Sequence, residues 1–264
     1  MSRYLLGMAL AAALALAPAA GGAWAGGGPA AGTVWTEPAT GIVFVWIPGG
    51  SFDMGCNPAG GRCPDGESPP HRVTVGGFWL SRTEITQGQW ARLMRDNPSS
   101  FKKGDDYPVD QVHWEDAAAF LARLNRAGHG RFRLPSEAEW EFACRSGHPD
   151  DPYCGGADPK DVAWYISDTI KSRSTMPVGR KAPNAFGLFD MSGNLWEWTA
   201  DCWVEGDPRA PADGRPRADK ECLSRVLRGG SWGNYPAQLR ASARRSDTDV
   251  KCPFIGLRLA RDPD

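Results

Sequence analysis

The feature that most constrains the fold is the fifteen-residue stretch Gly187–Asp201, which reads GLFDMSGNLWEWTAD. Gly187 and Gly193 permit turns that a residue with a Cβ atom resists. Two tryptophans flank Glu197, and large aromatic side chains contribute strongly to protein cores. Aromatic surface beside turn-forming and acidic residues is typical of a rigid, partly buried loop. We therefore expect the rest of the chain to pack around this stretch.

The same stretch has the donor types of a cation site. Calcium binds carboxylate oxygens together with backbone carbonyls. Asp190 and Glu197 offer carboxylates, and Gly193 and Leu195 lie between them at alternating positions and offer carbonyls. In the alternative interpretation, Asp190 and Asn194 cap turns and Glu197 pairs with an arginine. The spacing alone does not separate the two interpretations.

The N-terminus has the pattern of a secretory signal peptide, residues 1–25. Arg3 supplies the positive charge, residues 4–17 form an apolar run, and Ala-Trp-Ala at 23–25 fits a cleavage site. An uncleaved anchor is the alternative, but the apolar run is short for a membrane span. Residues 26–32 are rich in Gly and Ala and predict a flexible linker.

Residues 33–264 have the length of one large domain or two small ones, and nothing in them marks a boundary between halves. We therefore predict a single α+β domain.

Arg3 is the only charged residue of the leader, so the mature chain has 29 of the 30 basic residues and all 31 acidic residues, a net charge of −2. This balance gives no electrostatic reason to expect nucleic acid as a partner. No later apolar run reaches membrane-spanning length, so we expect no membrane span after removal of the leader.

Three near-neighbour pairs account for six of the seven cysteines, all of which follow the leader. An exported protein meets an oxidising compartment, where disulfides form. The near neighbours suggest the disulfides Cys56–Cys63, Cys144–Cys154 and Cys202–Cys222, with Cys252 left over. Twelve Trp, 32 Gly and 22 Pro also predict a loop-rich fold with little regular structure.

Helix signals are concentrated in the first half of the chain. Thr86 as N-cap predicts a helix over about 87–95, and apolar spacing predicts a second over about 114–126. Ser136 and Glu139 form a capping box that predicts a third helix ending near 145. We expect strands at 41–54 (two, around a Pro-Gly-Gly turn), 72–75, 78–85, 132–134, 162–166, 176–178, 225–232 and 256–260.

Common catalytic motifs are missing from the sequence. The four histidines, His71, His113, His129 and His148, have no pair at helical spacing, so no helical metal site is indicated. There is no HExxH, no phosphate-binding loop and no GxSxG elbow. Ser231 follows two glycines, but no histidine partner is visible for it as a nucleophile.

Six segments taken together resemble one family, the formylglycine-generating enzyme (sulfatase-modifying factor) superfamily. They are FVWIPGGSFDMG, HRVTVGGFWLSRTEITQGQW, FRLPSEAEWEFACRSG, NAFGLFDMSGNLWEW, RVLRGGSW and IGLRLAR. The resemblance extends from about Thr33 to Arg261. It implies one compact, loop-rich domain distantly related to C-type-lectin-like folds.

The resemblance also implies a structural calcium ion. By position, its ligands are the side chains of Asp190 and Glu197 and the carbonyls of Gly193 and Leu195. Asp190 stands where the family commonly has Asn, and both residue types supply oxygen. A second calcium site of the family lies upstream, but residues 162–175 do not reproduce its ligands, so we do not predict that site.

The catalytic signature of the family is where this sequence departs from the resemblance. Formylglycine-generating enzymes have GGSxxCxxxxC and bind copper through the two cysteines. Here the segment reads GGSWGNYPAQL, which places Asn234 and Leu239 at those positions. Neither side chain supplies the thiolate that a soft copper site needs. We therefore do not expect copper or formylglycine generation.

Two hypotheses from different classes follow for this chain as a periplasmic or secreted monomer. In the first, it is a non-redox accessory module that binds a peptide or small molecule. In the second, it is an oxidative maturation enzyme resembling the exported family members of pyoverdine maturation. Both place the ligand in a cleft beside Trp196, Ser231, Trp232, Asn234 and Arg240. We favour the first because the catalytic cysteines are missing.

Overall fold

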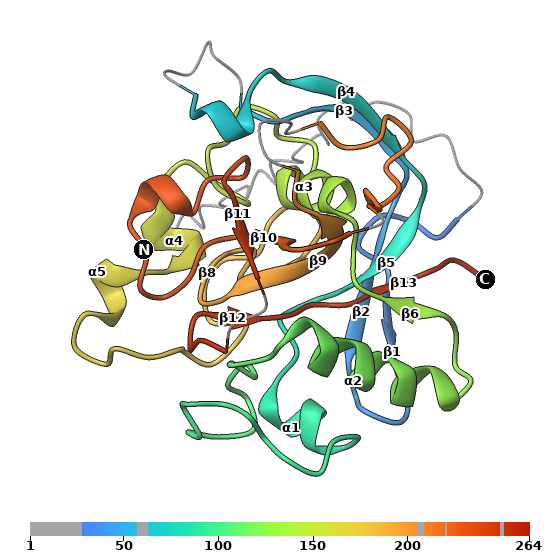
Figure 1. Cartoon of the computed structure of the whole chain (residues 1–264), viewed down its shortest axis with the longest axis vertical. Coiled ribbons are helices and arrows are strands. Elements are labelled where there is room, and N and C mark those ends of the chain that lie inside the picture. Colours follow the sequence, from blue (N-terminus) through green and yellow to red (C-terminus); the bar gives the residue numbers. More distant parts are fainter. Residues whose placement is uncertain (1–27, 57–62, 205–208, 220, 249–250) are drawn as a thin grey trace, which may run out of the picture.

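The computed structural model of the chain describes residues 28–56, 63–204, 209–219, 221–248 and 251–264. The predicted signal peptide and the first residues of the predicted linker lie outside these ranges. Helices and strands are mixed along the chain, as an α+β fold requires, and long loops connect them (Figure 1). In this part of the chain, no helix combines the length and apolar character needed to cross a membrane.

A five-stranded antiparallel sheet occupies one side of the molecule (Figure 1). Its strands, in spatial order, are β1 (Val34–Thr36), β2 (Val43–Ile47), β5 (Phe78–Ser81), β13 (Ala260–Arg261) and β6 (Phe132–Arg133). The last strand of the chain therefore pairs with strands from its first half. Because β13 lies between β5 and β6, this sheet holds the C-terminal strand within the fold.

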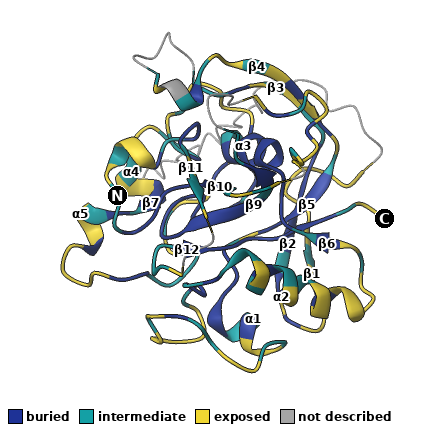
Figure 2. Ribbon diagram, in the orientation of Figure 1, coloured by how far each residue is buried: buried dark blue, intermediate teal, exposed yellow. Residues whose placement is uncertain are grey.

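The second sheet has four strands and contains the stretch of interest. Its order is β11 (Arg244–Asp247), β10 (Arg225–Arg228), β9 (Trp196–Cys202) and β12 (Ile255–Gly256). Strand β9 runs parallel to β12 and antiparallel to β10. Six of its seven residues are buried, and Figure 2 shows it in dark blue at the centre of the molecule. The expectation that the chain packs around this stretch is confirmed.

Two small pairs of strands complete the sheets. They are β3 (Gly50–Met54) with β4 (His71–Val75), and β7 (Ala163–Trp164) with β8 (Ser192–Gly193). The two strands expected around the Pro-Gly-Gly turn are present as β2 and β3. They do not pair with each other, because β2 joins the five-stranded sheet and β3 pairs with β4.

The three predicted helices form at the predicted capping signals. They are α1 (Gln87–Ala91), α2 (Trp114–Arg126) and α3 (Glu137–Arg145). Thr86 and Ser136 each cap their helix in a capping box. The first helix is shorter than predicted, since the backbone N–H of Arg92 donates to Gln89 and the chain leaves the α-helical pattern there. Leu93 and Met94 then pack on the core from a turn.

The second half of the chain has short elements that sequence periodicity did not predict. They are α4 (Pro159–Val162), α5 (Ile166–Thr169) and the 3-10 turn η3 (Pro236–Gln238). A further 3-10 turn, η2 (Asp65–Glu67), lies in the first half. The strand predicted at 162–166 is therefore wrong except for β7, because α4 and α5 take its two ends. No strand forms at 176–178 either.

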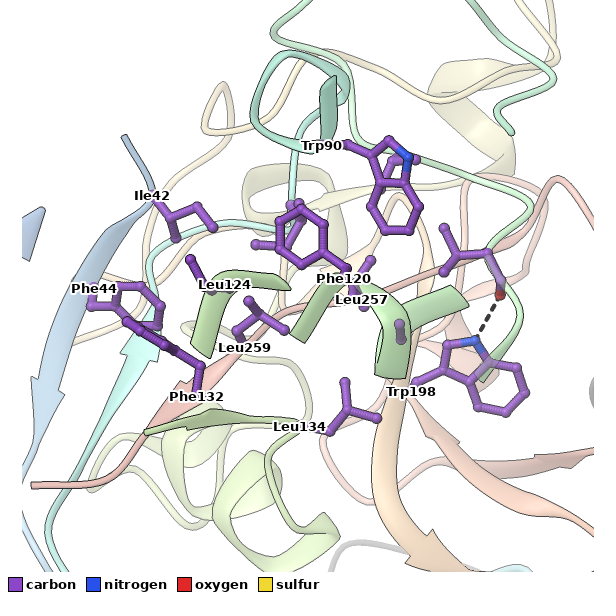
Figure 3. Close-up of a cluster of buried hydrophobic side chains, with 14 of the residues drawn as sticks. Ile42, Phe44, Trp90, Phe120, Leu124, Phe132, Leu134, Trp198, Leu257 and Leu259 are labelled. Atoms are coloured by element: carbon purple, nitrogen blue, oxygen red, sulfur yellow. Dashed lines mark hydrogen bonds between the residues drawn. The ribbon is translucent and has the colours of Figure 1, made fainter. Parts of the chain in front are cut away.

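The hydrophobic core has two main clusters. The first joins α1 and α2 to both large sheets and contains Trp196, Trp198, Trp90 and Phe120. In Figure 3 the rings of Trp90 and Phe120 lie against each other, and the indole N–H of Trp198 donates to the carbonyl of Val112. The second cluster surrounds Trp140 of α3. Tryptophans from distant segments thus replace long regular elements in organising the fold.

Three disulfides secure the loops, and all three predicted pairs are confirmed: Cys56–Cys63, Cys144–Cys154 and Cys202–Cys222. Cys252 is a half-buried free thiol.

Candidate functional site

The two glycines of the opening stretch have the backbone that the sequence indicated. Gly187 and Gly193 both have φ of 84°, a region that favours glycine. A Cβ atom on Gly193 would also collide with the backbone carbonyl of Trp164. Gly193 therefore permits β8 to lie against β7, and it fixes where β9 begins.

Glu197 is fully buried and is paired through only one of its two oxygens. Its Oε2 accepts from Nε of Arg258 at 2.6 Å and from the indole N–H of Trp140 at 2.6 Å. Its Oε1 is buried and has no hydrogen-bond partner. The arginine pairing weighed in the sequence is present, and it leaves the second oxygen available. Burying a carboxylate oxygen without a hydrogen-bond partner costs desolvation free energy. A ligand that binds this oxygen would offset that cost.

Asp190 repeats this arrangement seven residues earlier. Its Oδ2 accepts from the backbone N–H of Gly179 at 2.7 Å, and its buried Oδ1 has no partner. The residue has φ of 55°, which is uncommon for a side chain with a Cβ atom. Burial raises the pKa of Asp190 to about 6, so its charged form lacks full compensation from the protein alone.

Hydrogen bonds fix the directions of the two candidate carbonyl ligands. The N–H of Asn194 donates to the carbonyl of Trp164, and the N–H of Trp196 donates to that of Phe254, both at 2.8 Å. In a trans peptide the C=O points away from the N–H, so Gly193 and Leu195 direct their carbonyls away from these partners. Gly229 packs closely beside them: a Cβ atom on it would lie 3.1 Å from the Met191 oxygen and 3.8 Å from the Leu195 oxygen.

Glu84 is a third buried carboxylate beside the site. Burial, followed by the charges of Asp190 and Glu197, raises its pKa well above the usual value. Arg258 is the cation that interacts with all three acids. With all three carboxylates ionised, they and the guanidinium would have a formal charge of −2, which one divalent cation balances.

These residues fit a calcium ion, which the structure does not contain. No group of three or more His, Cys, Asp or Glu side chains in the described ranges is arranged to hold a metal. The expected ligand set has only two such side chains, since its other two ligands are carbonyls. The unpartnered oxygens of Asp190 and Glu197 are the observation that supports the fit. Calcium at this position remains a prediction.

The GGSW segment is folded back on itself. Oδ1 of Asn234 accepts from both the N–H and the hydroxyl of Ser231, each at 2.8 Å. The indole N–H of Trp232 donates to the carbonyl of Pro253. Leu239 is fully buried, and it packs with Tyr165 in a small apolar cluster. Neither position that holds cysteine in the formylglycine pattern presents a reactive group.

The five expected cleft residues differ in exposure. Trp196, Ser231 and Trp232 have only 3%, 1% and 7% of their surface exposed, whereas Asn234 and Arg240 are half-buried. Trp196 belongs to the main core rather than forming the cleft wall we expected, because the parallel pairing of β9 with β12 covers it. Arg240 makes two 2.7 Å hydrogen bonds to Glu67, so its guanidinium is held by the protein itself.

Sequence reasoning missed Glu84, Arg258 and Glu67. Glu84 and Glu67 have no neighbouring motif that indicates a role, and Arg258 lies inside a segment interpreted as a strand. A small polar pocket was missed as well. Its lining includes Glu67, Glu137, Glu141 and Arg244. Arg244 pairs with Glu137, and Arg228 pairs with Glu141, so this pocket sits in a self-compensated network.

Comparison with known proteins identifies the class. Residues 31–263 match the model of the "Sulfatase-modifying factor enzyme 1-like domain", so the chain belongs to the formylglycine-generating enzyme (sulfatase-modifying factor) family. The mouse formylglycine-generating enzyme is 27% identical, over 83% of this chain and 75% of that protein. The chaperone protein LppX of Paenibacillus barcinonensis is 29% identical, over 72% of this chain and 81% of that protein.

Two solved structures support the fold. PvdO from Pseudomonas aeruginosa is 29% identical, with a TM-score of 0.81 over 89% of this chain and all of that one. Treponema denticola variable protein 1 is 26% identical, with a TM-score of 0.76 over 88% of this chain and 99% of that one. The predicted single α+β domain of this family is confirmed.

Proposed function

We propose that this chain is an exported accessory module that binds a peptide or small molecule and does not generate formylglycine. The observation that supports the proposal most directly is that neither of the two cysteine positions of the catalytic pattern holds a cysteine in this chain. Asn234 closes a turn on Ser231, and Leu239 is buried. Neither supplies the thiolate needed to bind copper.

The ligand surface of this proposal lies beside Trp232. Phe254 stacks on its ring at 4.7 Å, and Phe101 packs edge-on at 5.6 Å. Both phenylalanines are half-buried and so retain accessible surface. Tyr235 and Ile170 are exposed by 68% and 63%, and the N–H of Ile166 donates to Asn234, which brings these two segments together. Exposed apolar and aromatic side chains around a polar turn are typical of a binding surface.

Positive charge borders this surface. Lys102, Lys103, Lys171 and Arg173 are all exposed. The ammonium group of Lys103 donates to the hydroxyl of Ser174 at 2.6 Å, which joins the two segments that carry these cations. No acidic residue lies within 99–104 or 169–176. An anionic peptide or small molecule is therefore the ligand class that we propose.

The names of two relatives support a non-catalytic role. LppX is called a chaperone protein, and a bovine relative that is 27% identical is called an inactive formylglycine-generating enzyme. Family members with these names make the loss of formylglycine chemistry compatible with a working protein. Three disulfides and the predicted signal peptide support the periplasm or the exterior as its location.

The alternative is an oxidative maturation enzyme that acts in the periplasm at the same surface. The resemblance of the sequence to the exported family members of pyoverdine maturation favours this alternative. The two functions differ in one measurable way, since only the enzyme consumes an oxidant.

We also propose that calcium binds at Asp190, Gly193, Leu195 and Glu197 as a structural ion. Bound there, calcium would compensate the buried carboxylates and fix the loop that precedes β9. Asp190 and Glu197 would each contribute the oxygen that lacks a hydrogen bond. The ion has no proposed part in a reaction.

Binding of labelled peptides tests the proposed function. Fluorescence anisotropy would compare glutamate-rich, lysine-rich and neutral peptides of equal length that each carry one aromatic residue. We expect the acidic peptide to bind most tightly, with affinity that falls as salt rises. The double variant Lys171→Glu/Arg173→Glu should weaken it at least tenfold. The control Arg72→Glu, on exposed β4, should change it less than twofold. Equal binding of all three peptides would contradict the proposal.

A further inference from the structure

Glu84 reaches the cation site from a distant part of the chain and contacts it at two points. Its Oε1 accepts from the backbone N–H of Leu195 at 2.8 Å, and its Oε2 accepts from the side-chain amide of Asn194 at 2.7 Å. Glu84 is completely buried, so both contacts are made without solvent. One side chain thus holds two consecutive residues of the loop between β8 and β9.

We propose that Glu84 is a positioning residue for the cation site, which it holds in the ligand-binding conformation. The inference rests on the proposed calcium site. Glu84 would not contact the ion, because both of its oxygens already accept hydrogen bonds. Its effect would pass through Leu195, whose carbonyl is a proposed ligand.

The geometry of the backbone explains how the position is fixed. The peptide between Asn194 and Leu195 is held at both ends: its N–H donates to Glu84, and its carbonyl accepts from the N–H of Trp232 at 2.8 Å. The next peptide is held by the N–H of Trp196, which donates to Phe254. The Leu195 carbonyl therefore has little rotational freedom. Without Glu84, one of these restraints is lost and a buried N–H is left unpaired.

Asn194 extends the restraint to a further segment. Its side-chain oxygen accepts from the N–H of Met176, and its amide donates to the Met176 carbonyl as well as to Glu84. Asn194 has φ of 57°, so its backbone is in the left-handed region and depends on such anchors. Glu84 thus joins the loop before β9 to the segment at Met176.

The negative charge of Glu84 contributes to calcium affinity independently of its hydrogen bonds. Glu84, Asp190 and Glu197 together with Arg258 have a formal charge of −2, which matches a divalent cation. Replacing Glu84 by a neutral residue leaves −1, so a bound calcium ion would leave one uncompensated positive charge in a buried site. Both the geometric and the electrostatic contribution predict weaker calcium binding.

A purely structural role for Glu84 makes a different prediction. A buried acceptor that only supports the fold would change stability equally with and without calcium. A positioning residue changes the calcium affinity itself, because partners that orient metal ligands typically contribute 10- to 100-fold to metal affinity. The calcium dissociation constant therefore separates the two roles.

The test is a calcium titration by isothermal calorimetry on the mature, disulfide-intact chain and on Glu84→Gln. We expect one site in the wild type and an affinity at least tenfold weaker in the variant. Glu37→Gln is the matched control, because Glu37 is also buried and accepts from backbone N–H groups, at Ala39 and Thr40. Its calcium affinity should stay within twofold of the wild type.

A second variant keeps the test decisive if Glu84→Gln does not fold. Glu84→Asp retains the charge but is one methylene too short to reach both donors, and we expect about a tenfold loss. Affinity unchanged in a folded Glu84 variant would overturn the role of Glu84 and leave the calcium site standing. No calcium binding by the folded wild type would overturn both.

Discussion

Replacing Arg258 by methionine should destabilise the protein more than any single surface substitution. The guanidinium of Arg258 is fully buried and joins three segments. It pairs with Glu197 of β9 and donates to the carbonyls of Ser81 in β5 and Phe189, at 3.1 and 2.8 Å. Methionine preserves most of the side-chain volume and removes every one of these donors.

The magnitude follows from the partners that are left behind. Removing one member of a buried ion pair typically destabilises a protein by about 3–5 kcal/mol. The buried carbonyl of Ser81 also loses a donor, at about 1–3 kcal/mol if nothing replaces it, and so does the part-buried carbonyl of Phe189. We therefore expect a loss of at least about 4 kcal/mol, a large part of a typical stability of about 5–15 kcal/mol.

Urea unfolding at pH 7 without calcium, followed by tryptophan fluorescence, measures this loss. With a slope of about 2 kcal/mol per M, the midpoint should fall by about 2 M. The control is Arg72→Met, which breaks an exposed ion pair with Asp53 and should cost about 0–1 kcal/mol. A loss below about 1 kcal/mol for Arg258→Met would refute the view that this buried charge cluster holds the two sheets together.

Three further predictions concern the disulfides, pH and calcium. Removing Cys202–Cys222 by a double alanine substitution should lower the free energy of unfolding by about 3 kcal/mol in urea, because the bridge closes a loop with a sequence separation of 20. Burial, followed by the charge of Glu137, raises the pKa of Asp201 from 3.8 to about 7, so its contribution to stability is present below pH 3.8 and is lost as pH rises to about 7. Urea unfolding should show the wild type losing up to roughly 4 kcal/mol relative to Asp201→Asn over that range, and parallel curves would contradict this. Chelation of calcium should lower the melting temperature of the wild type measured by calorimetry, whereas Asp190→Asn/Glu197→Gln should show a smaller response.

Local signals in the sequence were sufficient to predict the three longest helices, α1, α2 and α3. The capping boxes at Thr86 and Ser136 act within four residues, and the apolar spacing of 114–126 reflects packing on a single face. The near-neighbour cysteines also paired as predicted. Each of these features depends on residues close together in the chain, so a single sequence contains the necessary information.

The site itself depends on contacts between distant residues. Glu84 lies 111 residues before Leu195, and Arg258 lies 61 residues after Glu197. Arg258 is a charged residue in an apolar segment, which is a weak signal of its role, whereas Glu84 lies in the polar run SRTEIT and has no such signal. We expected Trp196 beside a ligand cleft, but its side chain has only 3% of its surface exposed and packs in the main core. The likeness to the family identified the loop, and only the structure shows its compensating charges.

Oxygen consumption is the most direct test of the claim that this family member binds without formylglycine chemistry. The calcium-loaded mature chain would be incubated with copper, a reductant and cysteine- or tyrosine-containing peptides in an oxygen electrode, with mass spectrometry of the peptides. We predict no uptake above the protein-free control and no change in peptide mass. Sustained uptake with stoichiometric conversion of either peptide would contradict the account and favour the oxidative maturation enzyme.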